Sequence, residues 1–159
     1  MPDTTTTLAD LLDREAVIER ITALFLATDR RDWTAVERCF TPEVRFDMSS
    51  AGGGPEATLG AGDIAAGWHA GLAPMEHVHH QAGNFVVRVA GDRAEAFCYG
   101  IAYHHRARAD GRSVRVFVGS YDFSLERGDD AEGASPWRIA AMRFTLKFID
   151  GNPALEAAE

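Results

Sequence analysis

The sequence of 159 residues lacks long apolar runs, and none approaches the roughly 18 consecutive apolar residues of a membrane span. Basic residues are also few, because 16 lysines and arginines face 24 aspartates and glutamates, for a formal net charge of −8. Nucleic-acid binding depends on clustered basic side chains that neutralise phosphates. We therefore expect neither a membrane nor a nucleic acid as a partner.

Cysteine is rare, and the two that occur, Cys39 and Cys98, stand in apolar surroundings without metal-ligand spacing. We interpret both as buried free thiols without a chemical role. A secretory signal is missing as well, since Met1-Pro2-Asp3-Thr4 includes no basic segment followed by an apolar one. The sequence therefore predicts a cytoplasmic protein.

The sequence contains no complete motif for two common kinds of ligand site, a phosphate-binding loop and a metal site. Gly52-Gly53-Gly54 is not followed by the Lys-Ser/Thr of a phosphate-binding loop, so we interpret it as a flexible loop. His77 and His79 put two imidazoles on one face of a strand, which is a common arrangement of metal ligands. The glutamate that a cupin would add soon afterwards is absent. We predict no metal and no cofactor.

The chain begins with a helical pattern. Apolar residues recur at steps of three and four and predict an amphipathic helix over residues 8–30, namely Leu11, Ile18, Ile21, Leu24, Phe25 and Thr28. Asp29 falls on the same stripe, so an acid faces the core. Asp32 and Asp63 are expected to cap two further helices, the second over residues 64–72. A half-buried strand around Val44 and Phe46 lies between these helices, followed by a loop over residues 49–62.

Long strands follow from His77 onward. They are expected at residues 77–90, 94–108, 113–127 and 137–149, with hairpin turns at Gly91-Asp92 and Asp110-Gly111 and a polar loop at residues 128–136. Helices first and an antiparallel meander afterwards indicate the α+β class. We expect a single domain over residues 1–159, with an ordered core of about 8–149.

Histidine is the strongest lead to chemistry, because it both takes and gives protons near neutral pH. Three of the six histidines, His77, His79 and His80, open the first long strand. His104 and His105 lie on the next expected strand, where alternation puts them on opposite faces. Periodicity does not say which of these two faces inward, and a bulge would exchange them.

Three motifs together resemble the SnoaL-like branch of the nuclear transport factor 2-like superfamily. They are Ala27-Thr28-Asp29-Arg30-Arg31-Asp32-Trp33, Phe40-Thr41-Pro42-Glu43-Val44-Arg45-Phe46-Asp47 and His79-His80-Gln81-Ala82-Gly83-Asn84. The resemblance implies a cone-shaped α+β barrel, with a strongly curved mixed sheet wrapped around N-terminal helices and an apolar pocket between them. Members include dehydratases, a dehydrochlorinase, polyketide cyclases, ketosteroid isomerases and non-catalytic dioxygenase subunits, so the fold does not choose the reaction.

The resemblance is closest to scytalone dehydratase, bile-acid dehydratase and hexachlorocyclohexane dehydrochlorinase. It implies three catalytic residues, Asp29, His80 and His105. In such a pair Asp29 holds one ring nitrogen of His80, and the other nitrogen abstracts a proton beside a carbonyl group. Thr28, Met48 and about Tyr121 replace polar residues of scytalone dehydratase, so scytalone itself is not the expected substrate.

We expect a small hydrophobic molecule to bind among Phe25, Met48, Trp68, Tyr103, Tyr121 and Phe144. Tyr103 or Tyr121 is a candidate donor to an enolate oxygen. The sequence favours a cofactor-independent lyase, a dehydratase of a polyketide, steroid or aromatic catabolite. The alternatives are a non-catalytic assembly subunit, like a dioxygenase small subunit, and an isomerase or polyketide cyclase. The apolar outer face of the sheet predicts a homodimer or homotrimer.

Overall fold

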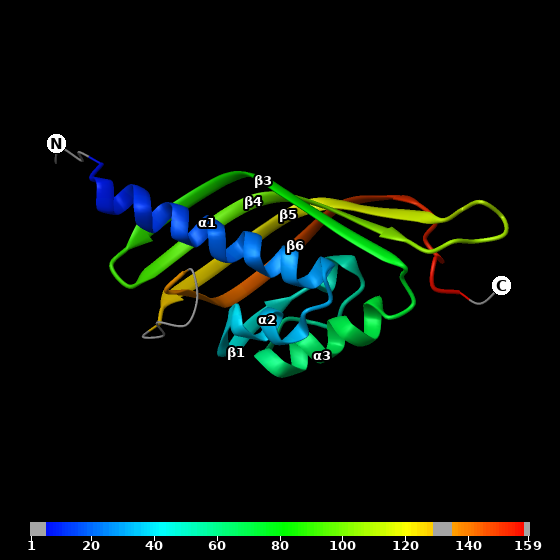
Figure 1. Ribbon diagram of the computed structural model, residues 1–159, viewed down its shortest axis with the longest axis horizontal. Coiled ribbons are helices and arrows are strands. Elements are labelled where there is room, and N and C mark those ends of the chain that lie inside the picture. Colours follow the sequence, from blue (N-terminus) through cyan, green and yellow to red (C-terminus); the bar gives the residue numbers. More distant parts are fainter. Residues whose placement is uncertain (1–5, 129–134, 158–159) are drawn as a thin grey trace.

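Helix α1 (Leu8–Asp29) crosses one face of a curved sheet in the computed structural model, which describes residues 6–128 and 135–157 (Figure 1). Thr7 caps the helix, since its hydroxyl accepts from the amide of Asp10 at 3.2 Å and its own amide donates to the Asp10 carboxylate at 2.8 Å. The predicted apolar stripe is buried from Ile21 to Thr28, whereas Ile18 is half-buried and Leu11 remains 51% exposed. The first turns of α1 therefore extend beyond the core.

Two short helices follow the first. Asp32 caps α2 (Trp33–Arg38) as predicted, by accepting from the amide of Ala35 at 3.0 Å. The predicted cap of α3 (Ala61–Leu72) is wrong, because Gly60 occupies that position and Asp63 lies inside the first turn. There its negative charge still interacts favourably with the positive end of the helix dipole.

Six strands form one mixed sheet in the order β2-β1-β6-β5-β4-β3. Their bounds are β1 Phe40–Asp47, β2 Ala57–Gly60, β3 His77–Ala90, β4 Arg93–His105, β5 Val114–Arg127 and β6 Trp137–Gly151. Neighbouring strands are antiparallel, except that β1 and β6 run parallel. The long strands are confirmed with ends shifted by up to three residues. Of the loop predicted at residues 128–136, residues 129–134 lie outside the described part of the chain.

The segment 49–62 was expected to be a loop, and this expectation is wrong in part. It contains the 3-10 turn η1 (Ser49–Ala51) and the edge strand β2, which pairs with β1 through Leu59 and Val44. So short a strand leaves no alternating pattern in the sequence, which is why the periodicity missed it.

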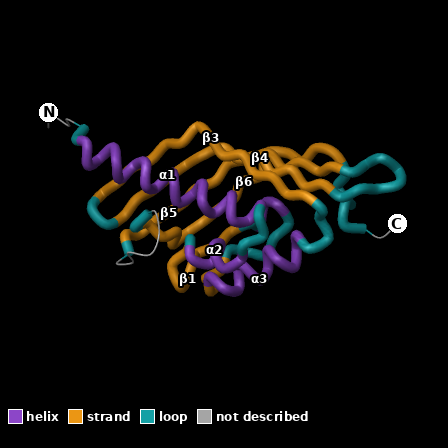
Figure 2. Tube along the Cα trace, in the orientation of Figure 1, coloured by secondary structure: helices purple, strands orange, loops and turns teal. Residues whose placement is uncertain are grey.

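Bulges bend the sheet around the helices. The register of β3 with β4 shifts between Gly83 and Val86, where Asn84 adopts a positive φ of 58°. The register of β5 with β6 shifts as well, between Val118 and Gly119. An extra residue on one strand bends it and increases its twist. The result is the cone-shaped α+β fold that the sequence predicted, with all helices along one side of the sheet (Figure 2).

The main core lies between α1 and the inner face of the sheet, where Leu24, Trp137 and Ile139 are fully buried. Cys39 and Cys98 are buried free thiols, as predicted. None of the helices in the described ranges has the length and apolarity needed to cross a membrane.

Candidate active site

A cavity of about 500 Å³ opens between α1, α3 and the inner face of the sheet. Its wall is largely apolar and includes Phe25, Phe46, Met48, Trp68, Phe117 and Phe144. A few polar side chains interrupt this wall, namely Thr28, His80, His104, Tyr121 and Glu156. An apolar cavity of this size with few convergent polar groups is typical of a site for a small organic molecule.

Asp29 and His80 lie in contact at the edge of this cavity. Asp29 is the last residue of α1, and its Oδ1 lies 2.7 Å from Nδ1 of His80. Its Oδ2 accepts the backbone N–H of His80 at 2.9 Å. Both side chains are mostly buried, at 14% and 13% exposure. Because the carboxylate accepts at Nδ1, that nitrogen holds the proton, and the lone pair of Nε2 is left for the cavity.

Phe25 fixes the plane of this imidazole. Its ring stacks on the ring of His80, with centroids 5.2 Å apart and an interplanar angle of 17°. Phe25 and Asp29 are four residues apart on α1, so they share one face of the helix. The stripe that carries the acid also carries the aromatic ring that orients its partner.

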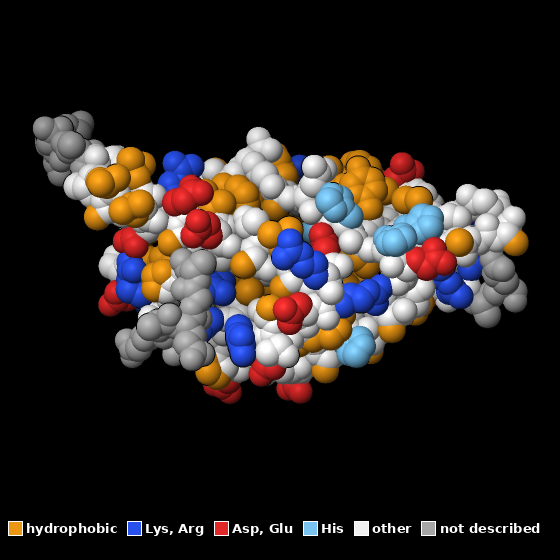
Figure 3. All heavy atoms as spheres, viewed as in Figure 1, with side chains coloured by type: hydrophobic (Ala, Val, Ile, Leu, Met, Phe, Trp, Pro, Cys, Tyr) orange, Lys and Arg blue, Asp and Glu red, His pale blue; other side chains and the backbone are white. Residues whose placement is uncertain are grey.

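The second histidine of the cavity is His104, and the prediction that His105 faces it is wrong. The pairing of β4 with β5 has no bulge, so the alternation holds through Ala102 and His104 on the inner face. His105 lies on the outer face, with its Nδ1 3.3 Å from the Glu76 carboxylate and its ring beside His77. Figure 3 shows histidine side chains at the surface next to an acidic one.

Tyr103 likewise lies outside the cavity, which corrects its predicted place in the binding site. It is 40% exposed on the outer face, with its ring 6.3 Å from that of His79. The other predicted binding residues, Phe25, Met48, Trp68, Tyr121 and Phe144, all line the cavity. Tyr103 and His105 are two residues apart on β4, so the alternation that places His105 on the outer face places Tyr103 there as well.

Tyr121 is a deeply buried polar side chain of the cavity, with 4% exposure. Its ring packs between Phe25 at 5.0 Å and Phe144 at 4.7 Å. Burial raises the pKa of its hydroxyl, which therefore keeps its proton. Within the described part of the chain this hydroxyl makes no hydrogen bond. The site thus contains a protonated donor on a ring that packs against Phe25, as the ring of His80 does.

Tyr121 owes this position to a glycine on the neighbouring strand. A Cβ atom at Gly100 would lie 2.1 Å from the ring of Tyr121, so only glycine leaves room for that ring on the inner face. No local sequence pattern indicates this packing, because the two residues meet only when β4 and β5 pair.

His104 has its own partners at the far end of the cavity. Its Nδ1 lies 3.2 Å from Nη2 of Arg115, which in turn pairs with the Glu156 carboxylate. Burial, and then the positive charge of Arg115, lower the pKa of His104 to about 4. His104 is therefore neutral at physiological pH, in a wall that is largely apolar.

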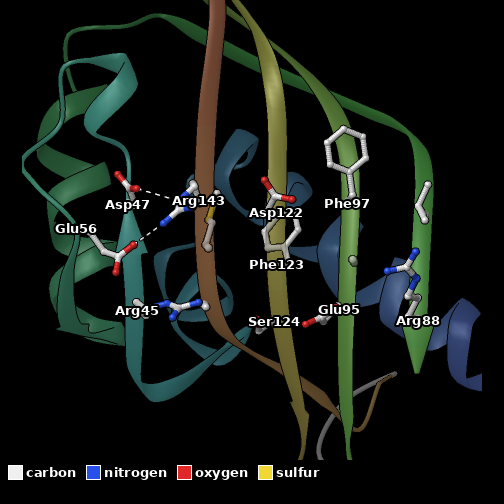
Figure 4. A pocket seen from close by; sticks show the side chains of 14 residues that line it. Arg45, Asp47, Glu56, Arg88, Glu95, Phe97, Asp122, Phe123, Ser124 and Arg143 are labelled. Atoms are coloured by element: carbon white, nitrogen blue, oxygen red, sulfur yellow. Dashed lines mark hydrogen bonds and ion pairs between the residues drawn. The ribbon is translucent and has the colours of Figure 1, made fainter. Parts of the chain in front are cut away.

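A second hollow, of about 420 Å³, lies on the outer face of the sheet and is charged rather than apolar (Figure 4). Arg143 bridges Asp47 at 3.0 Å and Glu56 at 2.7 Å, while Arg45, Arg88, Glu95 and Asp122 lie around it. Exposed ion pairs of this kind are screened by solvent and contribute little. The inner cavity is therefore the candidate active site.

The two buried thiols offer no competing site. Burial raises the pKa of the Cys98 thiol to about 12, and that of Cys39 is raised as well, so both remain protonated. Over residues 6–128 and 135–157 no group of three or more histidine, cysteine or acidic side chains is arranged to hold a metal ion.

The family model of the SnoaL-like domain matches residues 9–143. The Kfla4162 protein from Kribbella flavida has a similar structure, with 26% identity, a TM-score of 0.83, and coverage of 93% of this chain and 99% of that chain. A protein from Novosphingobium aromaticivorans with the provisional name of an aromatic ring hydroxylase shares 26% identity at a TM-score of 0.72, covering 92% and 98%.

The type 2 hexachlorocyclohexane dehydrochlorinase LinA is also similar in fold, with 14% identity, a TM-score of 0.72, and coverage of 97% of this chain and 98% of that chain. No curated protein matches the sequence. The family model covers most of the chain, and the cone-shaped fold agrees with it. The chain therefore belongs to the SnoaL-like domain family.

Proposed function

We propose that the protein is a cofactor-independent dehydratase of small, largely apolar hydroxy-carbonyl compounds. The observation that carries this proposal is the contact of Asp29 with His80 through both carboxylate oxygens, at the wall of an apolar cavity. A neutral imidazole held in this way is a competent general base, because the carboxylate stabilises the imidazolium that forms.

In the proposed reaction His80 Nε2 removes a proton from the carbon next to the substrate carbonyl. The electron pair of that C–H bond moves into an enolate, then forms the carbon–carbon double bond and expels the hydroxyl group from the β carbon. The leaving oxygen takes the proton from imidazolium His80 and departs as water. The enzyme returns to its starting state, and no oxidant or reductant is needed.

The hydroxyl of Tyr121 is the proposed donor to the enolate oxygen. It is protonated, buried and without a partner in the described residues, so the ligand can satisfy it. Donors fixed in advance toward developing charge in an apolar site are often the largest electrostatic contribution to a rate. General acid–base catalysis adds roughly 10²–10⁴-fold.

The cavity also supports the substrate class. About 500 Å³ with a mostly aromatic and aliphatic wall suits a compact ring system, such as a polyketide, a steroid or an aromatic catabolite. The similarity in fold to a dehydrochlorinase is compatible with an elimination, since loss of HCl and loss of water both begin with removal of a proton.

The test is water loss from a panel of β-hydroxy carbonyl compounds, followed by mass spectrometry with the wild type, Asp29→Asn and His80→Gln. His77→Gln is the matched control, because His77 lies on the same strand but outside the cavity. We expect turnover in the wild type and the control, and its loss in both dyad variants. Proton exchange without water loss would instead indicate an isomerase.

A non-catalytic assembly subunit is the second candidate, favoured by the likeness to the Novosphingobium aromaticivorans protein named as an aromatic ring hydroxylase. In that case the panel would show no turnover, and the dyad variants would behave like the wild type.

We also propose self-association as a dimer or trimer through the outer face of the sheet, where Tyr99 and Phe148 are 45% and 56% exposed. Light scattering of wild type and Phe148→Glu tests it, and a monomeric wild type would contradict it.

A further inference from the structure

His104 and Arg115 form a cross-strand pair on the inner face of the sheet. They stand directly opposite each other on β4 and β5, and Nη2 of Arg115 lies 3.2 Å from Nδ1 of His104. A guanidinium only donates hydrogen bonds and keeps its charge in proteins. Nδ1 of His104 must therefore accept, and the proton of the neutral ring lies on Nε2.

His80 has the opposite arrangement. Its Nδ1 faces the Asp29 carboxylate, which only accepts when ionised, so the proton lies on Nδ1. One histidine of the cavity thus presents a lone pair at Nε2, and the other presents an N–H. The two neighbours, a carboxylate and a guanidinium, select opposite tautomers of the same side chain.

Arg115 is held in turn by the C-terminal segment. Its Nη1 lies 2.8 Å from Glu156 Oε2, and its Nη2 contacts Glu156 Oε1. Arg115 is only 8% exposed, and a buried cation without its partner would be strongly destabilising. Glu156 therefore supplies the charge that keeps the guanidinium beside His104.

The segment that carries Glu156 is firmly attached. Leu155 is fully buried against Met75 and Val78. Nη1 of Arg106 donates to the backbone carbonyl of Glu156 at 2.8 Å and to that of Leu155 at 3.3 Å. Glu156 is thereby fixed at the cavity wall, although it comes after the last strand.

We propose that Arg115 and Glu156 are positioning residues, which hold His104 as the neutral Nε2–H tautomer and make it a hydrogen-bond donor to a substrate oxygen. This inference rests on the proposed function for its catalytic meaning, but the tautomer itself is a property of the protein without substrate. The low pKa of His104, about 4, agrees with a ring that accepts from a cation and stays neutral.

At pH 7 a neutral imidazole donates a hydrogen bond through its N–H but does not transfer the proton. His104 would therefore polarise an oxygen of the substrate, together with Tyr121, while His80 moves the proton. The hydroxyl of the substrate would leave with the proton that His80 has taken, so no second acid is needed. This division of labour matches the two tautomers.

The test is ¹⁵N NMR of the imidazole nitrogens in uniformly labelled protein at pH 7, without ligand, with signals assigned through His104→Gln and His80→Gln. We expect His104 with a protonated Nε2 and an unprotonated Nδ1, and His80 with the reverse. A His104 with its proton on Nδ1, or a doubly protonated His104, would overturn the proposal whatever the activity assays show.

Variants test the two positioning residues. In Arg115→Met the Glu156 carboxylate is left beside His104, so we expect Nδ1 of His104 to gain a proton, whereas Arg115→Lys retains a cationic donor and the Nε2–H form. In Glu156→Gln we expect an Nδ1–H population of His104 to appear. Unchanged His104 signals in Arg115→Met would overturn the role of Arg115, and unchanged signals in Glu156→Gln that of Glu156.

Unchanged His80 signals show that a variant is folded. Glu76→Gln is the matched control, since it alters a carboxylate beside His105 on the outer face and should leave His104 as in the wild type. If Arg115→Met does not fold, the wild-type tautomer and Glu156→Gln still decide. Loss of turnover in Asp29→Asn bears on the proposed function alone, so the two can fail separately.

Discussion

Asp29 holds His80 at two points, through the ring Nδ1 at 2.7 Å and through the backbone N–H at 2.9 Å. The carboxylate at the end of α1 is thereby fixed to the backbone of β3 as well as to the imidazole. The ring cannot rotate or change tautomer without losing a charge-assisted hydrogen bond, which is worth about 1.5–3 kcal/mol. Preorganisation of the base is therefore built into the contact between helix and strand.

The first prediction concerns the charge of Asp29. Asp29→Asn keeps the shape but replaces one carboxylate oxygen by an N–H donor, which favours the wrong tautomer of His80. We expect kcat/KM for the elimination to fall by about 10²–10⁴-fold, with a melting temperature that still shows a folded protein. Steady-state kinetics and thermal unfolding of wild type and variant measure both effects, and unchanged kcat/KM would contradict the assignment of the dyad.

The second prediction separates the packing of Tyr121 from its hydroxyl. Because no described residue bonds that hydroxyl, Tyr121→Phe should change the free energy of unfolding by no more than about 0.5 kcal/mol. Removal of a donor to an enolate should nevertheless lower kcat by about 10²-fold. Denaturant unfolding and kinetics are the measurements. A strongly destabilised variant would mean that the hydroxyl has a structural partner instead.

The third prediction uses the glycines of α3 that line the cavity. A Cβ atom at Gly67 meets nothing within 4 Å, so Gly67→Ala should stabilise the protein by about 0.5–1 kcal/mol through helix propensity. Gly67→Leu should instead fill part of the cavity and weaken binding of an apolar fluorescent probe. The alanine variant is the control for the helix. Equal probe binding by both variants would place the ligand elsewhere.

The fourth prediction is the pH dependence of stability due to His104. Its pKa is lowered from 6.5 to about 4 in the folded protein. Between pH 4 and pH 6.5, His104 therefore binds a proton in the unfolded chain but not in the folded protein. Stability is therefore fully present above pH 6.5 and is lost as the pH falls toward 4, by up to about 3 kcal/mol.

Urea unfolding of wild type and His104→Gln at pH 7.5, 5.5 and 4.5 checks this sign. The wild type should lose more stability on acidification than the variant, whereas His105→Gln, on the outer face, should behave like the wild type. Equal acid sensitivity of wild type and His104→Gln would contradict a neutral, buried His104.

The sequence predicted the parts of the site that depend on local periodicity. Asp29 and Phe25 follow from a helical stripe, whereas His80 was chosen among three histidines through the resemblance to the SnoaL-like branch. The choice between His104 and His105 did not follow, because alternation fixes two faces without saying which is inside. That choice is made by the pairing of β4 with β5, which is a property of the whole sheet.

No pattern in the sequence predicted that Glu156 belongs to the site. It lies beyond the last strand, in a segment without periodic pattern, and reaches the cavity only through buried Leu155 and ion pairing with Arg115. Contacts between residues so far apart leave no local signal. Gly60, which replaced the expected cap Asp63, shows the same limit on a smaller scale, since β2 and its pairing with β1 decide where α3 begins.

The central claim is that Asp29 and His80 remove a proton and thereby drive loss of water from a hydroxy-carbonyl compound. The most direct measurement follows a substrate that is deuterated next to its carbonyl, in a single turnover in ordinary water, by mass spectrometry. We predict that the wild type loses deuterium and hydroxyl at the same rate, and that His80→Gln loses neither. Hydroxyl loss that proceeds equally fast in His80→Gln would contradict the account.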